Sequence, residues 1–179
     1  MPFLWYYCFM NLLFTGEPHV GKSTLLNNLI AGAPNRQGFV TNELLENGTR
    51  YGFELVSSLG NRAILASVHS LSQTRVGKYG VNLAELDSFL SKLPTAEPGR
   101  LLYIDEVGQM QLHSRAFRSL VREYLDSPAP FLGTLSSVYH DEFTDELRAR
   151  SDVEIIGLTL KDRDVVGGDI ASRIAELVY

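Results

Sequence analysis

The sequence predicts an α/β fold with a mostly parallel sheet, helices on both faces of the sheet and one added antiparallel hairpin. Short apolar runs at residues 11–15, 101–105, 131–137 and 152–160 are typical of strands that are buried on both faces. Segments with apolar residues at helical spacing alternate with these runs, and short breaks rich in Gly and Pro separate them. This alternation is the pattern of parallel strands joined by crossover helices.

Four helices are expected, each with one apolar face. The first begins at Lys22 and ends at Gly32, the second spans residues 83–93, the third about 114–125 and the fourth 169–178. The apolar faces consist of Leu25, Leu26, Leu29 and Ile30; Leu83, Leu86, Leu90 and Leu93; Phe117, Leu120, Val121 and Tyr124; and Ile170, Ile174, Leu177 and Val178.

The antiparallel hairpin is expected from residues 50–57 and 62–67, two strand-like runs that lie close together in the chain. The breaks between elements are expected at residues 32–38, 94–99, 126–130 and 166–169. None of these breaks is long enough to be a linker between domains, so residues 10–179 are expected to form one domain.

Composition excludes several classes of protein. The chain has 179 residues, with 45% apolar and 21% charged residues, which is typical of a soluble domain that needs no disulfide or structural metal. A net charge of −5 gives no electrostatic reason to expect nucleic acid or an anionic membrane as a partner. The single cysteine, Cys8, rules out an internal disulfide and fits the reducing cytoplasm.

The N-terminal residues 1–14 form a nearly unbroken apolar run. The run is shorter than the roughly 20 residues of a spanning helix, and it lacks the positively charged start and the cleavage site of a secretory signal. A second methionine, Met10, directly precedes the first expected strand. We therefore interpret residues 1–9 as an extension of little functional weight, from an upstream start; the alternative is a membrane-surface anchor.

The strongest motif is Gly-x-x-x-x-Gly-Lys-Ser at residues 16–23, between an apolar strand and a helix. In this setting successive backbone N–H groups cradle the phosphates of a nucleotide, and the helix N-terminus adds to the attraction. Lys22 is expected to reach the β- and γ-phosphates, and the Ser23 hydroxyl to bind Mg²⁺. The expected phosphate-binding residues are Gly16, Glu17, Pro18, His19, Val20, Gly21, Lys22, Ser23 and Thr24.

An acidic pair is expected beside this loop. The apolar run that ends in Asp105 would deliver a carboxylate to the phosphate site, where Asp105 can hold Mg²⁺ through a water. Glu106 follows directly, where it can polarise a water for attack on the γ-phosphorus. The strand residues Leu102, Tyr103 and Ile104 are included in the expected nucleotide-binding segment.

Further cations are needed for the charge that develops on the γ-phosphoryl oxygens. The arginines in loops or at the ends of expected elements are the candidates: Arg50, Arg75, Arg148, Arg150 and Arg163. His19 is a second open question, because it stands where a glycine is common and its backbone is expected to be left-handed.

With these motifs the chain resembles the cancer-related nucleoside-triphosphatase family, small P-loop hydrolases of thermophiles and animals. Beyond the P-loop, the resemblance rests on residues 38–55, 75–87, 104–114, 131–137 and 147–164. It implies a P-loop NTPase (RecA-like) fold and slow, Mg²⁺-dependent hydrolysis of ATP, GTP, CTP and UTP. It also aligns Glu43, Arg50, Arg75, Arg150 and Arg163 with recurrent polar positions of the family.

Three positions depart from the family pattern. Gln109 and Gln111 stand where the family usually has a lysine and a glutamate, and His19 replaces a glycine. If the lysine contributes to catalysis, activity is expected to be weaker here.

Two other functions share the P-loop. A small-molecule or nucleotide kinase would transfer the γ-phosphoryl group to a hydroxyl; the position of Glu106 and the lack of an arginine-rich lid segment argue against it. A non-enzymatic nucleotide switch is the other alternative. The guanine-reading motif Asn-Lys-x-Asp is absent, so weak base selectivity is expected and a GTPase-type switch is disfavoured.

Overall fold

The structure is a computed structural model and describes residues 10–178. The expected extension at residues 1–9 lies outside these residues, whereas Met10 is buried in the core directly before β1. In the described part of the chain, the strands form one mixed sheet with the order β5-β6-β4-β3-β2-β7-β8-β1-β9.

The strands are β1 (Asn11–Thr15), β2 (Arg36–Glu46), β3 (Thr49–Ser57), β4 (Arg62–Ser67), β5 (Arg75–Val76), β6 (Tyr79–Val81), β7 (Leu101–Val107), β8 (Phe131–Leu135) and β9 (Val153–Gly157). The five strands β2, β7, β8, β1 and β9 are parallel neighbours. The remaining pairings, β2–β3, β3–β4, β4–β6 and β5–β6, are antiparallel.

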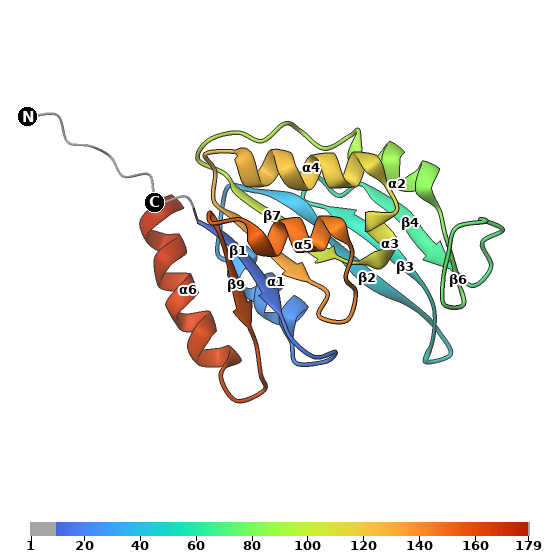
Figure 1. The fold of residues 1–179 in the computed structure, drawn as a ribbon, viewed down its shortest axis with the longest axis horizontal. Coiled ribbons are helices and arrows are strands. Elements are labelled where there is room, and N and C mark those ends of the chain that lie inside the picture. Colours follow the sequence, from blue (N-terminus) through green and yellow to red (C-terminus); the bar gives the residue numbers. More distant parts are fainter. Residues whose placement is uncertain (1–9, 179) are drawn as a thin grey trace, which may run out of the picture.

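The helices are α1 (Lys22–Ala31), α2 (Leu83–Leu90), α3 (Gln109–Leu112), α4 (Arg115–Asp126), α5 (Glu142–Ala149) and α6 (Arg163–Val178). Helices α1 and α6 pack on one face of the sheet, and α2 to α5 cover the other (Figure 1). Each face carries its own apolar core. The four expected helices and the β3–β4 hairpin are confirmed.

Strand β2 is the main element that the sequence did not reveal. It begins at Arg36, inside the expected break at residues 32–38, and lies in the middle of the sheet between β3 and β7. Gly38 permits this position, because a Cβ on it would lie 1.8 Å from the backbone oxygen of Tyr103 on β7. The antiparallel part of the sheet is therefore larger than one hairpin, since β2, β3, β4, β5 and β6 all contribute to it.

The expected break at residues 166–169 is wrong, because α6 runs through it from Arg163. Gly167 is a site of close helix packing: a Cβ there would lie 2.8 Å from Leu25 Cδ1 on α1. Helix α5 was also not expected. It begins at a capping box in which Asp141 and Thr144 exchange hydrogen bonds between side chain and backbone.

Candidate active site

The loop between β1 and α1 has the backbone of a phosphate cradle. Gly16 and Gly21 have positive φ angles of 142° and 97°, and His19 has φ of 66°, so the expected left-handed backbone at His19 is confirmed. Pro18 and His19 are exposed, while Val20 is buried in the core below the loop. The buried Val20 thus anchors the loop to the core, while Pro18 and His19 face solvent.

Lys22 lies across this cradle. Its Nζ donates hydrogen bonds to the backbone oxygens of Gly16 at 2.7 Å and Glu17 at 3.0 Å. Ser137, just after β8, donates from its Oγ to the same Gly16 oxygen at 2.9 Å. The ammonium group is therefore held at the mouth of the loop, within reach of a phosphate that enters it.

Asp105 lies at the carboxyl end of β7 and meets the P-loop. Its Oδ1 accepts hydrogen bonds from Ser23 Oγ at 3.0 Å and from Thr134 Oγ1 at 2.5 Å. The side chain is buried, with 2% exposed, and this burial raises the pKa of the Asp105 carboxyl. The hydrogen bonds of Thr134 and Ser23 and the charge of Lys22 oppose that shift.

Glu106 is half-buried and lies at the wall of the same site. Burial, and then repulsion from Asp105, raise the pKa of its carboxyl, while Lys22 opposes the shift. Gly108 leaves room for this side chain, because a Cβ there would lie 2.8 Å from Glu106 Oε1. Such a carboxylate readily accepts a proton, as a general base must.

Two cavities meet at Glu106, and Asp105 lines the second of them. The P-loop cavity, of about 590 Å³, is lined by Pro18, His19, Lys22 and their neighbours. A second cavity, of about 310 Å³, extends over β2, β3 and β4 towards α3. The residues that line both are Ser23, Glu43, Phe53, Glu106, Ser136 and Val138.

The five candidate arginines differ in their distance from the P-loop cavity. Only Arg50 among them lines the P-loop cavity; it forms an ion pair with Glu43, donates to Tyr79 Oη at 3.1 Å and lies 5.0 Å from the Phe53 ring centre. Arg163 lies at the start of α6 and donates from Nη1 to the backbone oxygen of Val20 at 3.4 Å.

The other three lie elsewhere. Arg148 donates to the backbone oxygen of Ser136 at 3.0 Å and so supports the loop after β8. Arg75 is exposed on β5 and donates to the Lys78 oxygen at 2.7 Å. Arg150 precedes β9, at the edge of the parallel strands opposite to the P-loop, and is paired with carboxylates there. The structure does not bring Arg75 or Arg150 to either cavity.

The strand residues Leu102, Tyr103 and Ile104 are core residues. Leu102 and Ile104 face one core and Tyr103 the other, with 4% or less of each exposed. Their side chains do not line either cavity. Their contribution is to place the acidic pair at the end of β7.

Sequence reasoning missed three hydroxyl groups that support the site. Thr134 on β8 binds Asp105, Ser137 binds the P-loop, and Thr41 on β2 donates from Oγ1 to the backbone oxygen of Asp105 at 2.6 Å. Each of them belongs to a strand or loop beside the motif in space but far from it in the chain, so no local signal could have found them.

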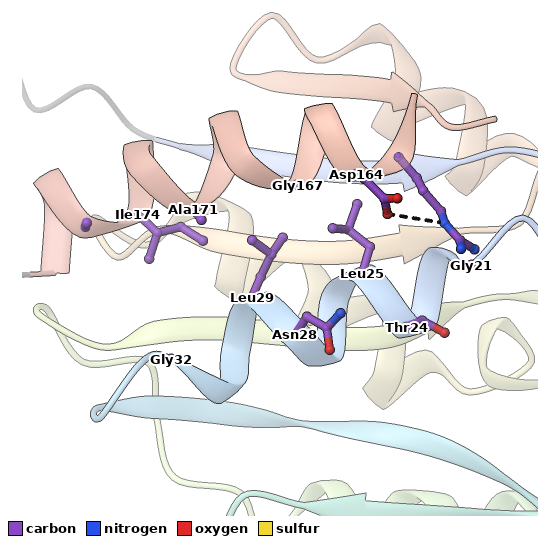
Figure 2. Close-up of a pocket in the computed structure, with 12 residues that line it drawn as sticks. Gly21, Thr24, Leu25, Asn28, Leu29, Gly32, Asp164, Gly167, Ala171 and Ile174 are labelled. Atoms are coloured by element: carbon purple, nitrogen blue, oxygen red, sulfur yellow. Dashed lines mark ion pairs between the residues drawn. The ribbon is translucent and has the colours of Figure 1, made fainter. Parts of the chain in front are cut away.

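A groove between α1 and α6 begins at the P-loop and runs along both helices (Figure 2). Gly21 and Thr24 line both this groove and the P-loop cavity. At its mouth Arg163 forms an ion pair with Asp164 at 3.5 Å, drawn as a dashed line in Figure 2, and Asn28 lies further along α1.

Comparisons with known proteins agree with this geometry. A sequence model of the family described as NTPase matches residues 11–171. A protein of Thermotoga sp. (strain RQ2) named nucleoside-triphosphatase THEP1 is 38% identical over 165 residues, 91% of this chain and 94% of its own length. A protein of the same name from Methanosarcina barkeri is 34% identical over 177 residues, 94% of this chain and 99% of its own.

Solved structures extend the comparison to the fold. The crystal structure of THEP1 from the hyperthermophile Aquifex aeolicus superposes with a TM-score of 0.81, at 31% identity, over 92% of this chain and 98% of that one. The solution structure of a human cancer-related nucleoside triphosphatase gives 0.75, at 30% identity, over 92% and 97%. The fold is therefore that of a P-loop NTPase, and the chain belongs to the NTPase family.

Proposed function

We propose that the protein hydrolyses nucleoside 5′-triphosphates to nucleoside diphosphate and phosphate, with Mg²⁺ as cofactor. One observation carries this proposal: the Ser23–Asp105 hydrogen bond of 3.0 Å, which joins the P-loop to the acidic pair. Ser23, Asp105 and Glu106 line one cavity beside the P-loop. The family assignment and the names of the relatives support hydrolysis as the reaction.

The residues present fit Mg²⁺. A Ser hydroxyl and a buried carboxylate lie together, and Mg²⁺ is usually held by one or two such oxygens plus substrate phosphates. Among residues 10–178, no cluster of three or more His, Cys, Asp or Glu could hold a metal alone. When bound, the ion neutralises charge on the β- and γ-phosphate oxygens.

The P-loop residues do the binding. The N–H groups of the loop receive the β-phosphate, and Lys22 exchanges its hydrogen bonds with Gly16 and Glu17 for bonds to the β- and γ-oxygens. Arg50 is the arginine proposed to stabilise charge on the γ-phosphoryl group, because it faces this cavity. Its partner Glu43 holds it there.

Glu106 is proposed as the general base. It accepts a proton from a water on the side of the γ-phosphorus opposite to the leaving diphosphate. Gly108 leaves the space for its carboxylate. This role is worth about 10²–10⁴-fold in rate.

The nucleoside is proposed to extend from Thr24 to the mouth of the α1/α6 groove. The side chains there, Thr24, Asn28 and Arg163, can contact a ribose or base without a matched set of donors and acceptors for one base. Hydrolysis of ATP, GTP, CTP and UTP at similar, slow rates is the expected outcome.

A cytoplasmic location is proposed from the cysteine usage of the chain. Within residues 10–178, the structure has no helix with the length and apolar character to cross a membrane.

Phosphate release from each of the four triphosphates, with and without Mg²⁺, tests the proposal. Lys22→Ala should abolish most nucleotide binding, whereas Glu106→Gln should bind nucleotide and lose about 10²–10⁴-fold in turnover. The exposed residues Lys92 and Glu85 provide matched controls as Lys92→Ala and Glu85→Gln. Turnover by Glu106→Gln at the wild-type rate would remove Glu106 from the mechanism.

Arg50→Ala tests the charge-stabilising role separately. An arginine supplied in cis is worth about 10³-fold or more in turnover, so the variant should lose that factor while still binding nucleotide. Arg62→Ala is the control, because Arg62 also pairs with a glutamate, Glu54, on the antiparallel strands but lies outside both cavities. Equal turnover by the two variants would exclude Arg50.

A further inference from the structure

The second cavity shares Ser23 and Glu106 with the P-loop cavity, but Lys22 does not line it. Lys22, Pro18 and His19 line only the P-loop cavity, whereas Glu106 and Ser136 line both cavities. A group that enters the second cavity therefore lies beside Glu106, the proposed general base. In-line displacement requires the attacking oxygen to lie opposite to the leaving diphosphate.

The second cavity includes the proposed Mg²⁺ site at Ser23 and Asp105 and also extends past it towards Val76 and Met110. Its volume of about 310 Å³ is at the lower end of the range of pockets for small organic ligands, about 300–1,000 Å³, and far above the roughly 30 Å³ of one water. Much of its wall is apolar, formed by Phe53, Leu65, Val76, Met110 and Tyr139. An apolar wall gives no advantage to a lone water but stabilises a carbon skeleton.

Uncharged polar groups lie near the acidic pair. Gln111 is buried, with 4% exposed, and donates from Nε2 to Thr41 Oγ1 at 3.2 Å. Thr41 in turn donates to the backbone oxygen of Asp105. Gln109 is exposed on the first turn of α3 and completes a polar rim. Amide groups of this kind can bond the hydroxyl groups of a ligand.

The charge of the wall restricts the class of ligand. None of the described residues that line the second cavity is a lysine, arginine or histidine, whereas Glu43, Asp105 and Glu106 are acidic. Recognition of a phosphate or carboxylate usually requires arginine or lysine. The wall therefore disfavours an anionic ligand, such as a nucleoside monophosphate, and accepts a neutral or cationic one.

We propose that the second cavity binds a small alcohol without net negative charge, which competes with water for the γ-phosphoryl group. The inference rests on the proposed triphosphate site and extends it. A bond forms between the alcohol oxygen and the γ-phosphorus, and the bond from that phosphorus to the β,γ-bridging oxygen breaks. The hydroxyl proton passes to the Glu106 carboxylate, and nucleoside diphosphate leaves. Hydrolysis is then the reaction of the same site with water in the cavity.

The test follows the label from ATP radiolabelled in the γ-phosphate, with Mg²⁺, in the presence of glycerol, ethanolamine, uridine or uridine 5′-monophosphate. Labelled phosphate and labelled acceptor are separated and counted in each reaction. At least one of the three non-anionic alcohols should be phosphorylated far beyond its molar ratio to water, at the expense of phosphate release. The monophosphate, which carries the same ribose hydroxyls as uridine plus an anion, should remain a poor acceptor.

Cavity variants locate the acceptor. Val76→Phe and Met110→Phe should each lower the ratio of labelled acceptor to labelled phosphate at least tenfold. Leu71→Phe, at a side chain that is 93% exposed, should leave the ratio unchanged. Because the ratio reports only active molecules, partial unfolding of a variant does not alter it.

The outcomes separate the two proposals. Phosphate release at an undiminished rate, with none of the three alcohols labelled, would overturn the acceptor cavity and leave hydrolysis in place. Labelling of uridine 5′-monophosphate as readily as uridine, or a ratio unaffected by both cavity variants, would overturn the assignment of the acceptor class and its site. If neither labelled phosphate nor a labelled acceptor were formed, the proposed function itself would be overturned, and the acceptor cavity with it.

Discussion

Thr134→Val removes one hydrogen bond from the centre of the site without changing its shape. In the native structure Thr134 Oγ1 donates to Asp105 Oδ1 at 2.5 Å, and only 1% of Thr134 and 2% of Asp105 are exposed. Valine fills the same volume but has no donor. Water has little access to replace the lost bond, so among the described residues the Asp105 carboxylate keeps only Ser23 as a side-chain donor.

The magnitude follows from the charge and burial of the acceptor. A hydrogen bond to a charged group contributes about 1.5–3 kcal/mol, so the free energy of unfolding should fall by about this amount. The proposed Mg²⁺ site should weaken as well. Partners that orient a metal-binding residue are typically worth about 10–100-fold in metal affinity, so the Mg²⁺ concentration for half-maximal phosphate release should rise by that factor.

Two measurements on one protein preparation check this prediction. Urea denaturation gives the change in stability, and phosphate release across a Mg²⁺ titration gives the half-maximal concentration. Thr134→Ser keeps the hydroxyl and should stay near the wild-type Mg²⁺ requirement. A valine variant whose half-maximal Mg²⁺ concentration lies within twofold of wild type would refute the reasoning that Thr134 positions Asp105.

Three further substitutions test separate parts of the structure. Gly38→Ala places a methyl 1.8 Å from a backbone oxygen of β7, so urea denaturation should show a loss of about 3 kcal/mol or more. Gly108→Ala places a methyl 2.8 Å from Glu106 Oε1; it should slow phosphate release about 10²-fold with little loss of stability. The Arg150 hydrogen bond lowers the pKa of the Asp152 carboxyl, so its stabilisation is present above the ordinary value of 3.8 and is lost as pH falls through the lowered value. Arg150→Met should therefore melt below wild type at neutral pH, converge with it in strong acid and retain phosphate release.

The P-loop and the four helices with a clear apolar face could be predicted from the sequence because their signals are local. Gly16, Gly21 and Lys22 occur at fixed spacing, and the positive φ angles of both glycines are what that spacing requires. Leu26 and Phe117 lie on apolar faces of helical period, and both are fully buried. A pattern within one segment is sufficient for features of this kind.

Strand β2 could not be predicted, because its residues respond to neighbours rather than to a pattern of their own. Only its first half contacts the parallel sheet: residues 36–40 pair with β7, and the rest extends as a ribbon with β3. Its outer half carries exposed polar side chains, Asn42 and Glu43 among them. In helix α6 a predicted break is in fact helical. Gly167 suggests a break in the sequence, but in the folded structure it lets α6 pack closely against Leu25 of α1.

The order of the strands explains why the site depends on β8. Strand β8 separates β1 from β7, so the P-loop strand and the acidic strand lie two strand spacings apart, about 10 Å. The P-loop and α1 cross above the carboxyl end of β8, and Ser23 meets Asp105 there. From this end Thr134 bonds to Asp105, while Ser137 bonds to the Gly16 oxygen that Lys22 also contacts.

The end of β8 therefore sets the distance between the phosphate cradle and the acidic pair. Removing the Thr134 hydroxyl affects only Asp105, to which it donates a hydrogen bond. Removing the Ser137 hydroxyl affects only the P-loop, where it donates to the Gly16 oxygen. Thr134→Val should thus weaken Mg²⁺ more than nucleotide, whereas Ser137→Ala should weaken nucleotide more than Mg²⁺, in paired titrations of phosphate release. If either variant lost affinity for Mg²⁺ and for nucleotide by the same factor, β8 would only separate β1 from β7 and would not position Asp105 and the P-loop individually.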